Sequence, residues 1–381
     1  MTATEHGTTA AGTVAPVRRT LADGRDICYF DDVGNAHPHT GVDRRELGPA
    51  AEAATMRFDV LTGEWVAIAA HRMTRTHLPT RADCPLCPTT DPAHPTEVPE
   101  PDYDVVVFGN RFPSFSAAAE VPTVTVTVTE ARLGAPDRPA TGRCEVICFS
   151  SDHTTSVAEL PRRRMRTVVA AWAQRTAELS AHPGIGQVFC FENRGEEIGV
   201  TLAHPHGQIY AYPYVTPRTA AVLTQARRHA QRTGGHLLRD VLRAEQRAAT
   251  RMVLAGEHWS AYVPTAARWP VEVHLAPHRD VPDLAALDGD ERDELADVYQ
   301  ELLRRVDRFF PGVDRVPYIA GWHQAPVGAG RELGRLHLQV FSVLRAPGKL
   351  KYLAGSESGV GAWINDADPE TIAARLREVA S

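Results

Sequence analysis

The chain has 381 residues, 43% hydrophobic and 23% charged, which is typical of a globular protein with a substantial core. Its formal net charge of -6 argues against nucleic acid as the main partner, and no apolar run is long enough to span a membrane. The N-terminus lacks the basic and then apolar pattern of a secretory signal, so we expect a cytoplasmic protein.

The N-terminal part begins with residues 1–15, which are small and polar and predict a disordered tail. The Asp23-Gly24 turn, just before the apolar run at 27–30, predicts a short hairpin or an edge strand. Residues 57–75 predict a turn that feeds a strand, with Arg72 and Arg75 just past its end. Two arginines there suit a phosphate or diphosphate, although a solvated charged loop fits the spacing equally well.

Cys84 and Cys87 form a Cys-x-x-Cys pair in a proline-rich loop. Six cysteines in a chain of this length do not make a dense disulfide framework, which favours metal binding or burial. Two thiols at this spacing suit one tetrahedral zinc ion, whereas a redox role needs a strand-to-helix setting that prolines do not supply. A zinc site would take its two remaining ligands from elsewhere, and histidines are the candidates.

The next segments alternate between strands and a helix. Residues 105–108, 121–129 and 144–149 predict strands, and the last of these is followed by His153. Apolar residues at helical spacing predict an amphipathic helix from about 162 to 179, and residues 186–193 predict another strand.

The segment around His204, Pro205, His206, Gly207 and Gln208 has the most distinctive chemistry. In an extended segment, alternate side chains share a face, so both histidines and the glutamine are expected to form one polar row. The proline and the glycine leave the opposite face bare. A neutral imidazole is a good nucleophile toward phosphorus, and an amide two residues away can donate to a phosphoryl oxygen. A surface histidine pair is the simpler alternative, which the interleaved residues make less favourable.

The same order of elements recurs after a helical connection at about 216–251. Strands are expected at 258–263, 270–276, 316–322 and 336–341, a helix at 295–309, and a C-terminal helix at 368–380. The second copy keeps His337 and Gln339 of the motif, so we expect it to have lost catalysis and kept a binding or structural role. We predict an α+β fold with a duplicated unit, antiparallel sheets and flanking helices. The expected divisions are a tail (1–15), an N-terminal domain (16–215), a connection (216–250) and a C-terminal domain (251–381).

From about residue 57 to 379 the chain resembles the galactose-1-phosphate uridylyltransferases, the transferase branch of the histidine-triad superfamily. The most specific segments are Phe-Glu-Asn-Arg-Gly at 191–195, His-Pro-His-Gly-Gln at 204–208, Gly-Trp-His-Gln-Ala-Pro at 321–326 and Lys-Tyr-Leu-Ala-Gly at 351–355. The duplicated unit of the predicted fold agrees with this resemblance. Triad hydrolases have a further histidine where Gln208 stands, which favours the transferase branch.

The resemblance implies a double displacement on UDP-glucose and galactose 1-phosphate. His206 would attack the α-phosphorus of UDP-glucose to form a uridylyl-histidine, and galactose 1-phosphate would then take the uridylyl group. Gln208 would donate to the uridylyl oxygens. The resemblance also implies that phosphate is contacted by Arg72, Arg75, Asn193 and Thr201. It implies that the hexose 1-phosphate is contacted by Lys351, Tyr352 and Glu357, and Asn110 is a further candidate for binding substrate.

The resemblance also implies one structural zinc ion held by Cys84, Cys87, His153 and His204, and a homodimer whose active sites use both subunits. A buried, unliganded His153 is the alternative for that position.

Some members of the family hold a second metal, often iron, on a glutamate and three histidines. Here His323 and His337 match, but Gln339 and Val222 stand at the other two positions, so we predict no iron.

Two other functions remain open at this point. One is a dinucleoside-polyphosphate phosphorylase, or another nucleotidyltransferase of the same superfamily, which shares the histidine chemistry. The other is a zinc-stabilised, non-catalytic module that binds nucleotides. An intact His206 and Gln208 argue against the module, because binding alone needs no nucleophile.

Overall fold

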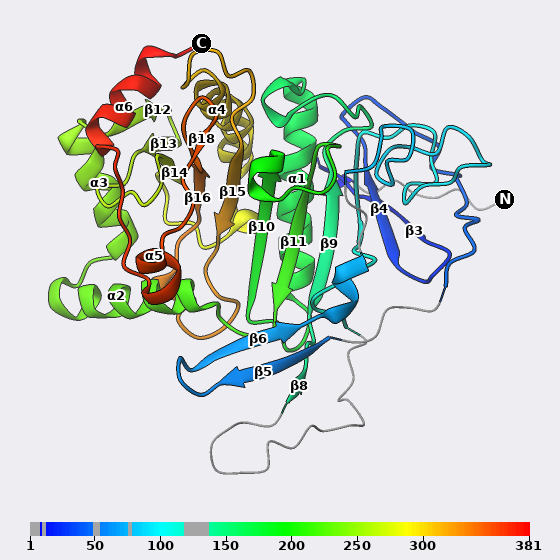
Figure 1. The fold of residues 1–381 in the computed structure, drawn as a ribbon, viewed down its shortest axis with the longest axis horizontal. Helices are drawn as coiled ribbons and strands as arrows, with labels where there is room; N and C mark the ends of the chain where they lie inside the picture. Colours follow the sequence, from blue (N-terminus) through cyan, green and yellow to red (C-terminus); the bar gives the residue numbers. More distant parts are fainter. Residues whose placement is uncertain (1–7, 10–12, 49–53, 75–77, 118–136) are drawn as a thin grey trace.

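The computed structural model describes residues 8–9, 13–48, 54–74, 78–117 and 137–381 (Figure 1). The predicted strand at 121–129 lies outside these residues, as does most of the predicted disordered tail at 1–15. Within that tail the structure has two short paired strands, β1 (Thr8–Thr9) and β2 (Thr13–Val14).

The described residues of the N-terminal half form strands and one long helix. They are β3 (Val17–Thr20), β4 (Asp26–Phe30), β5 (Thr55–Asp59), β6 (Glu64–Ile68), β7 (Val105–Gly109), β8 (Arg138–Pro139), β9 (Arg143–Cys148), α1 (Arg162–Ser180), β10 (Gln187–Arg194) and β11 (His206–Tyr212).

The rest of the chain begins with two helices in the region predicted to be helical and continues with the strands and helices of the C-terminal half. The elements are α2 (Pro217–Thr233), α3 (Leu237–Ala248), β12 (Met252–Ala255), β13 (Trp259–Tyr262), β14 (Val271–Pro277), α4 (Gly289–Asp307), β15 (Tyr318–His323), β16 (His337–Ser342), β17 (Leu344–Ala346), β18 (Lys349–Leu350), α5 (Gly355–Val360) and α6 (Pro369–Glu378).

One large sheet joins the two halves. In the described part of the chain it has eleven strands in the order β12-β13-β14-β16-β15-β10-β11-β9-β7-β4-β3, and every neighbouring pair is antiparallel. The halves meet where β10 pairs with β15, at the centre of the view in Figure 1. The predicted α+β class with antiparallel strands is therefore confirmed.

The order of the strands reads symmetrically outward from that junction. The unit β9-α1-β10-β11 of the N-terminal half corresponds to β14-α4-β15-β16 of the C-terminal half. The repeat seen in the sequence thus corresponds to a repeat in the sheet. His206 and His337 occupy equivalent places, because each is the first residue of the strand that follows the junction strand.

The main core lies between the sheet and helices α1 and α4, which pack on one of its faces. Aromatic side chains fill the centre of this core, where the ring of Trp172 on α1 lies 6.1 Å from the rings of Tyr299 and Trp322. The remaining apolar clusters and α3 lie on the opposite face. His206 and Gln208 belong to this second face, because the intervening Gly207 faces Phe149 and Ile147 of the main core.

Local sequence signals explain several boundaries. The predicted Asp23-Gly24 turn joins β3 and β4 as an edge hairpin, with Gly24 at φ 82°. Helix α4 begins at a capping box, in which Asp288 accepts from the backbone of Glu291 and the Glu291 side chain accepts from the backbone of Asp288.

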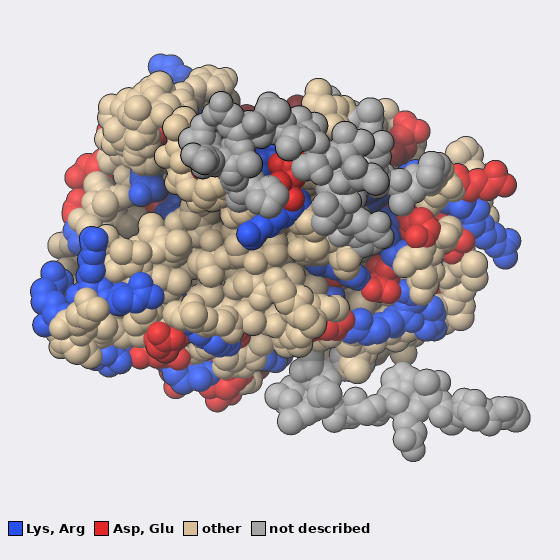
Figure 2. Space-filling model, turned by 90° about the horizontal axis from the view of Figure 1, so that it is seen from below, with Lys and Arg blue, Asp and Glu red and all other residues tan. Residues whose placement is uncertain are grey.

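The face seen from below has a broad uncharged area with basic and acidic side chains around it (Figure 2). Among the described residues, none of the helices combines the length and the apolar character needed to cross a bilayer.

Candidate active site

His206 begins strand β11, and Gln208 follows it on the same face of the sheet. In the ladder His206 lies opposite Cys148 of β9, and Gln208 lies between Val146 and Phe191. His204 precedes the strand, so the expectation that the whole motif is one extended strand is wrong for that residue. The physical reason is Pro205, which has no N–H to donate to the ladder.

A backbone hydrogen bond fixes the ring of His206. Its Nδ1 lies 2.7 Å from the carbonyl oxygen of His204, and a carbonyl can only accept, so Nδ1 carries the proton. Burial lowers the pKa of His206 below its usual value, although the bond to the His204 carbonyl opposes this. The ring is therefore neutral at neutral pH, and its lone pair is on Nε2, which makes Nε2 the nucleophilic atom.

His204 also belongs to a cluster of four potential metal ligands. The donor atoms of Cys84, Cys87, His153 and His204 all lie within 4.8 Å of one another. Cys87 Sγ lies 3.3 Å from Nδ1 of His153 and 3.5 Å from Nδ1 of His204. The structure thus brings together all four residues predicted as zinc ligands, from three distant parts of the chain.

The chemistry of this donor set fits a metal cation. Nε2 of His204 lies 2.8 Å from the carbonyl oxygen of Ser150, so Nε2 carries the proton and Nδ1 turns its lone pair toward the thiols. Burial lowers the pKa of His204 to about 3, which keeps the ring neutral. Burial and the neighbouring Cys84 raise the pKa of Cys87 to about 12, so a thiolate at that position requires a cation beside it.

Tyr103 was not predicted as part of this region. Its hydroxyl donates to the carbonyl oxygen of Leu86, at 3.1 Å, and lies 3.1 Å from Nε2 of His204. Tyr103 thereby links the Cys-x-x-Cys loop to His204. Its only signal in the sequence is its place just before a strand, which does not indicate a role.

A cavity of about 230 Å³ opens beside His206. Asn193, His204 and His206 line it, together with Arg194 and Arg315. Asn193 was predicted to bind substrate, and the structure places it on β10 in the ladder next to the start of β11. Arg315 was missed. It lies in the loop before β15 and donates to the carbonyl oxygen of Thr154 at 2.8 Å, and nothing in the sequence distinguishes it from other surface arginines.

Of the two arginines predicted to bind phosphate, only Arg72 lies in the described part of the chain. Arg72 lies in the short 3-10 helix after β6, and its Nη1 donates to Ser114 Oγ at 2.9 Å and lies 3.3 Å from the hydroxyl of Tyr210. Tyr210 is two residues beyond Gln208 on the same face of β11, so Arg72 reaches the predicted polar row. Arg75 lies outside the described residues.

Asn110 and Thr201 hold loops near these residues. The side-chain oxygen of Asn110 accepts from the backbone of Phe112 at 2.8 Å, and the carbonyl oxygen of Thr201 accepts from the backbone of Leu78 at 2.8 Å. Thr201 is three residues before His204 in the loop that precedes β11.

Lys351, Tyr352 and Glu357 lie in the C-terminal half and do not line the cavity beside His206. Lys351 and Glu357 form an ion pair at 2.8 Å, with side chains only 1% and 4% exposed. Tyr352 is 78% exposed. Within one chain the structure therefore does not bring these three residues to His206.

The region that matches the second metal site of the family does not fit a metal. His323 and His337 stack face to face, with ring centres 4.9 Å apart and an 11° angle between the planes. Gln339 and Val222 stand where two further ligands would be. Among the described residues, neither histidine belongs to a set of three close metal-ligand side chains.

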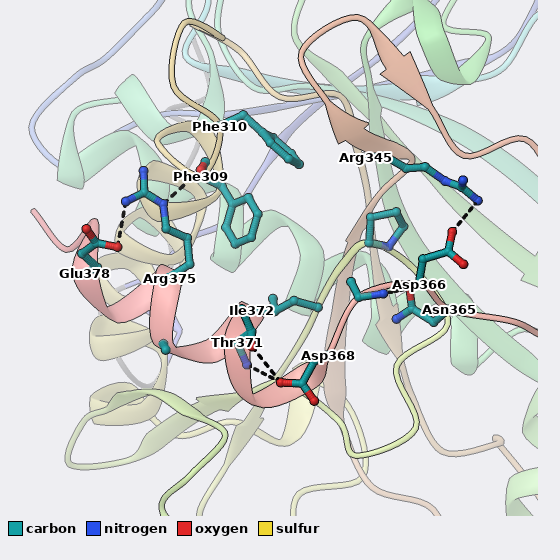
Figure 3. A pocket seen from close by; sticks show the side chains of 13 residues that line it. Phe309, Phe310, Arg345, Asn365, Asp366, Asp368, Thr371, Ile372, Arg375 and Glu378 are labelled. Atoms are coloured by element: carbon teal, nitrogen blue, oxygen red, sulfur yellow. Dashed lines mark hydrogen bonds and ion pairs between the residues drawn. The ribbon is translucent and has the colours of Figure 1, made fainter.

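Two other parts of the structure gather polar groups or enclose a cavity away from His206. Asp31, His37 and Asp104 form a second close group of potential ligands, but Asp104 is already paired with the guanidinium of Arg164. A wider cavity of about 660 Å³ lies between α6 and the end of α4 (Figure 3). In that view the rings of Phe309 and Phe310 face the cavity. Two ion pairs, Arg345–Asp366 at 3.0 Å and Arg375–Glu378 at 2.8 Å, lie at its edge. It contains none of the predicted site residues.

The comparisons with known proteins agree with the geometry around His206. A family model described as galactose-1-phosphate uridyl transferase, N-terminal domain, matches residues 46–216, and the model for the C-terminal domain of the same family matches residues 222–380. The chain belongs to the galactose-1-phosphate uridylyltransferase family. It is therefore a member of a family of nucleotidyltransferase enzymes, and the resemblance stated from its motifs is confirmed.

Individual galactose-1-phosphate uridylyltransferases match over nearly their whole length. The protein of that name from Streptomyces lividans is 45% identical over 374 residues, which cover 94% of this chain and 96% of the relative. The one from Thermotoga maritima is 34% identical over 85% of this chain and 98% of the relative. A solved structure of a uridylyltransferase superposes with a TM-score of 0.75 at 31% identity, over 85% of this chain and 98% of that one.

Proposed function

We propose that this enzyme transfers the uridylyl group from UDP-glucose to galactose 1-phosphate through a covalent intermediate on His206. The observation that carries the proposal is the bond from His206 Nδ1 to the carbonyl oxygen of His204, at 2.7 Å. It leaves a neutral Nε2 with its lone pair available in a cavity that Asn193 also lines. Relatives with high identity over most of the chain carry the name of this activity.

In the first step, Nε2 of His206 attacks the α-phosphorus of UDP-glucose. The N–P bond forms, the bond between that phosphorus and the bridging oxygen breaks, and glucose 1-phosphate leaves with the electron pair. The ring then carries positive charge, which the His204 carbonyl stabilises through Nδ1–H. In the second step, a phosphate oxygen of galactose 1-phosphate attacks the same phosphorus, and the ring leaves as neutral imidazole.

The phosphate charges need donors on the face of the sheet that carries His206. We assign this role to the amide groups of Gln208 and Asn193 and to the guanidinium of Arg72, which lies beside Tyr210 two residues from Gln208. Arg75, Asn110 and Thr201 complete the proposed contacts of the UDP moiety.

The four-ligand cluster is proposed to hold zinc in a structural role. Two thiolates and two imidazoles are a ligand set that Zn²⁺ accepts, and with all four positions taken by protein the ion has none open for substrate. His204 would then be fixed through its ring by the metal, while its carbonyl oxygen orients His206. The zinc ligands would therefore affect catalysis only by fixing His204, whose carbonyl oxygen positions the His206 ring.

A homodimer is proposed to complete the active site. Lys351, Tyr352 and Glu357 are remote from His206 in their own chain, so they would contact the hexose 1-phosphate in the active site of a partner copy. The segment that contains them also exposes apolar side chains, with Tyr352 78% and Val360 80% exposed. We further propose that the domains divide at 215/216 and 250/251, which places α2 and α3 in the connection.

Histidine variants test the proposal. His206→Ala is expected to abolish both exchange and the adduct with UDP-glucose, and peptide mapping of the wild type should place the adduct on the peptide that contains His206. His337→Ala is the matched control, because His337 occupies the equivalent place in the second half, with Nδ1 3.2 Å from the carbonyl of Arg335. Retained exchange in His206→Ala, or an adduct lost in His337→Ala only, would contradict the assignment.

A further inference from the structure

A buried polar bridge crosses the C-terminal half, starting at His323. Nε2 of His323 lies 3.2 Å from Oε1 of Gln339, and Nε2 of Gln339 donates to Oε1 of Glu272 at 2.6 Å. Gln339 and Glu272 are 3% and 2% exposed. Hydrogen bonds on both sides fix the orientation of the Gln339 amide, because its oxygen accepts and its nitrogen donates.

The other end of the bridge is the segment that leads into β14. Oε2 of Glu272 accepts from the backbone N–H of Arg268 at 2.6 Å and from that of Trp269 at 3.3 Å. Burial alone would raise the pKa of Glu272, yet bonds from His274, Arg268 and Gln339 hold this pKa below its ordinary value. The carboxylate is therefore charged and depends on these donors.

Lys351 is attached to the same segment. Its Nζ donates to the carbonyl oxygen of Arg268 at 2.8 Å and to that of Ile364, and it pairs with Glu357 at 2.8 Å. The ammonium also lies 5.8 Å from the ring centre of Trp269. The position of Lys351 therefore follows the position of residues 268–269, which Glu272 fixes.

We propose that Gln339 and Glu272 are positioning residues for the hexose 1-phosphate, because they hold the 268–269 segment that sets the place of Lys351. This inference rests on the proposed function, in which Lys351 contacts that substrate. The region matches a metal site in some relatives, but here the side-chain groups of Gln339 and Glu272 are bonded to each other. A bridge of side-chain hydrogen bonds thus links β14, β15 and β16 at this point.

The main test replaces the Gln339 amide with an apolar side chain of similar length. Gln339→Met is expected to raise the KM for galactose 1-phosphate about tenfold, the range for one hydrogen bond to a charged group. The Kd for UMP, measured by calorimetry, is expected to stay unchanged, because UMP lacks the hexose phosphate. Gln300→Met is the matched control, since Gln300 is also buried and donates to two carbonyls, but on α4 and away from Lys351.

A second pair of variants separates positioning from folding. In the wild type the Gln339 amide donates to the Glu272 carboxylate, and Glu272→Gln alone or Gln339→Glu alone removes this match of donor and acceptor. The double variant restores the match, with the amide now at position 272 and the carboxylate at position 339. The double variant should recover the KM for galactose 1-phosphate.

Several outcomes would overturn the inference. An unchanged KM in Gln339→Met, an equal rise in Gln300→Met, or an equal loss of UMP affinity would each do so. A second bound metal per chain in the wild type, found by elemental analysis, would also overturn it. A wild type that forms no uridylyl adduct would instead refute the proposed function, so the two failures are distinguishable.

Discussion

Gly207 separates the nucleophile from Gln208, and adding a single methyl group there should damage both stability and catalysis. A Cβ at this position would lie 2.8 Å from the carbonyl oxygen of Phe191 and from Cζ of Phe149, and 3.3 Å from Cγ2 of Ile147. The Phe191 carbonyl belongs to the neighbouring strand β10, so it cannot move without shifting the ladder. Gly207→Ala therefore forces β11 away from β10.

The magnitude follows from the cost of overpacking a core, which is about 1–3 kcal/mol for one added methyl group that backbone must accommodate. The displaced strand carries His206, and misplacing a reacting group by a fraction of an ångström to 1 Å lowers rates by up to about a hundredfold. We expect Gly207→Ala to lose about 1–3 kcal/mol of unfolding free energy and about 10–100-fold in kcat. Urea unfolding and steady-state exchange kinetics measure the two effects.

Gly321 provides a matched control on β15. A Cβ there would lie 2.6 Å from the end of the Phe189 ring, which is a side chain that can turn aside. Gly321→Ala is therefore expected to cost less stability than Gly207→Ala and to change kcat little. If Gly207→Ala retains wild-type stability and kcat, the tight fit of β11 against β10 is not needed to hold His206 in place.

Two further predictions concern the cluster of metal ligands and the buried Glu192. Cys87→Ser should lower bound zinc from one ion per chain and lower the melting temperature. The control Cys190→Ser changes a buried thiol outside the cluster and should keep the ion. Elemental analysis and thermal melting measure the two effects, and equal zinc content in both variants would contradict the prediction. Burial raises the pKa of Glu192 from 4.5 to about 7, although Arg194 and a hydrogen bond from Tyr318 oppose the shift. The folded state thus keeps a proton that the unfolded state loses, so the stability from this group is full below about pH 4.5 and is lost as the pH rises through about 7. Glu192→Gln should therefore gain up to about 3 kcal/mol over the wild type between pH 5 and pH 8 in urea unfolding, and a gap that is the same at both pH values would refute this.

Much of the architecture was readable from the sequence because its signals are local. Hydrophobic periodicity predicted α1 and α4, and the recurrence of the strand and helix order predicted the duplicated unit. The four potential zinc ligands were named from their residue types and the resemblance, and the structure brings them within 4.8 Å of one another.

The features that were missed depend on contacts between distant segments. No local pattern indicates that β10 pairs with β15, so the sequence did not predict that both halves share one sheet. Tyr103 reaches the metal cluster through Nε2 of His204, 101 residues away, and Nζ of Lys351 donates to the carbonyl oxygen of Arg268, 83 residues away. Such partners are set by tertiary packing, which residue type and spacing do not encode.

The most direct test of the covalent intermediate is the intact mass of the pure enzyme after incubation with UDP-glucose alone, with glucose 1-phosphate removed as it forms. The double displacement predicts a gain of one uridylyl group per chain, which galactose 1-phosphate then discharges as UDP-galactose. No mass gain, with UDP-glucose still turned over when galactose 1-phosphate is present, would contradict the covalent intermediate on His206. An adduct that only inorganic phosphate discharges would contradict the assigned acceptor and indicate a phosphorylase.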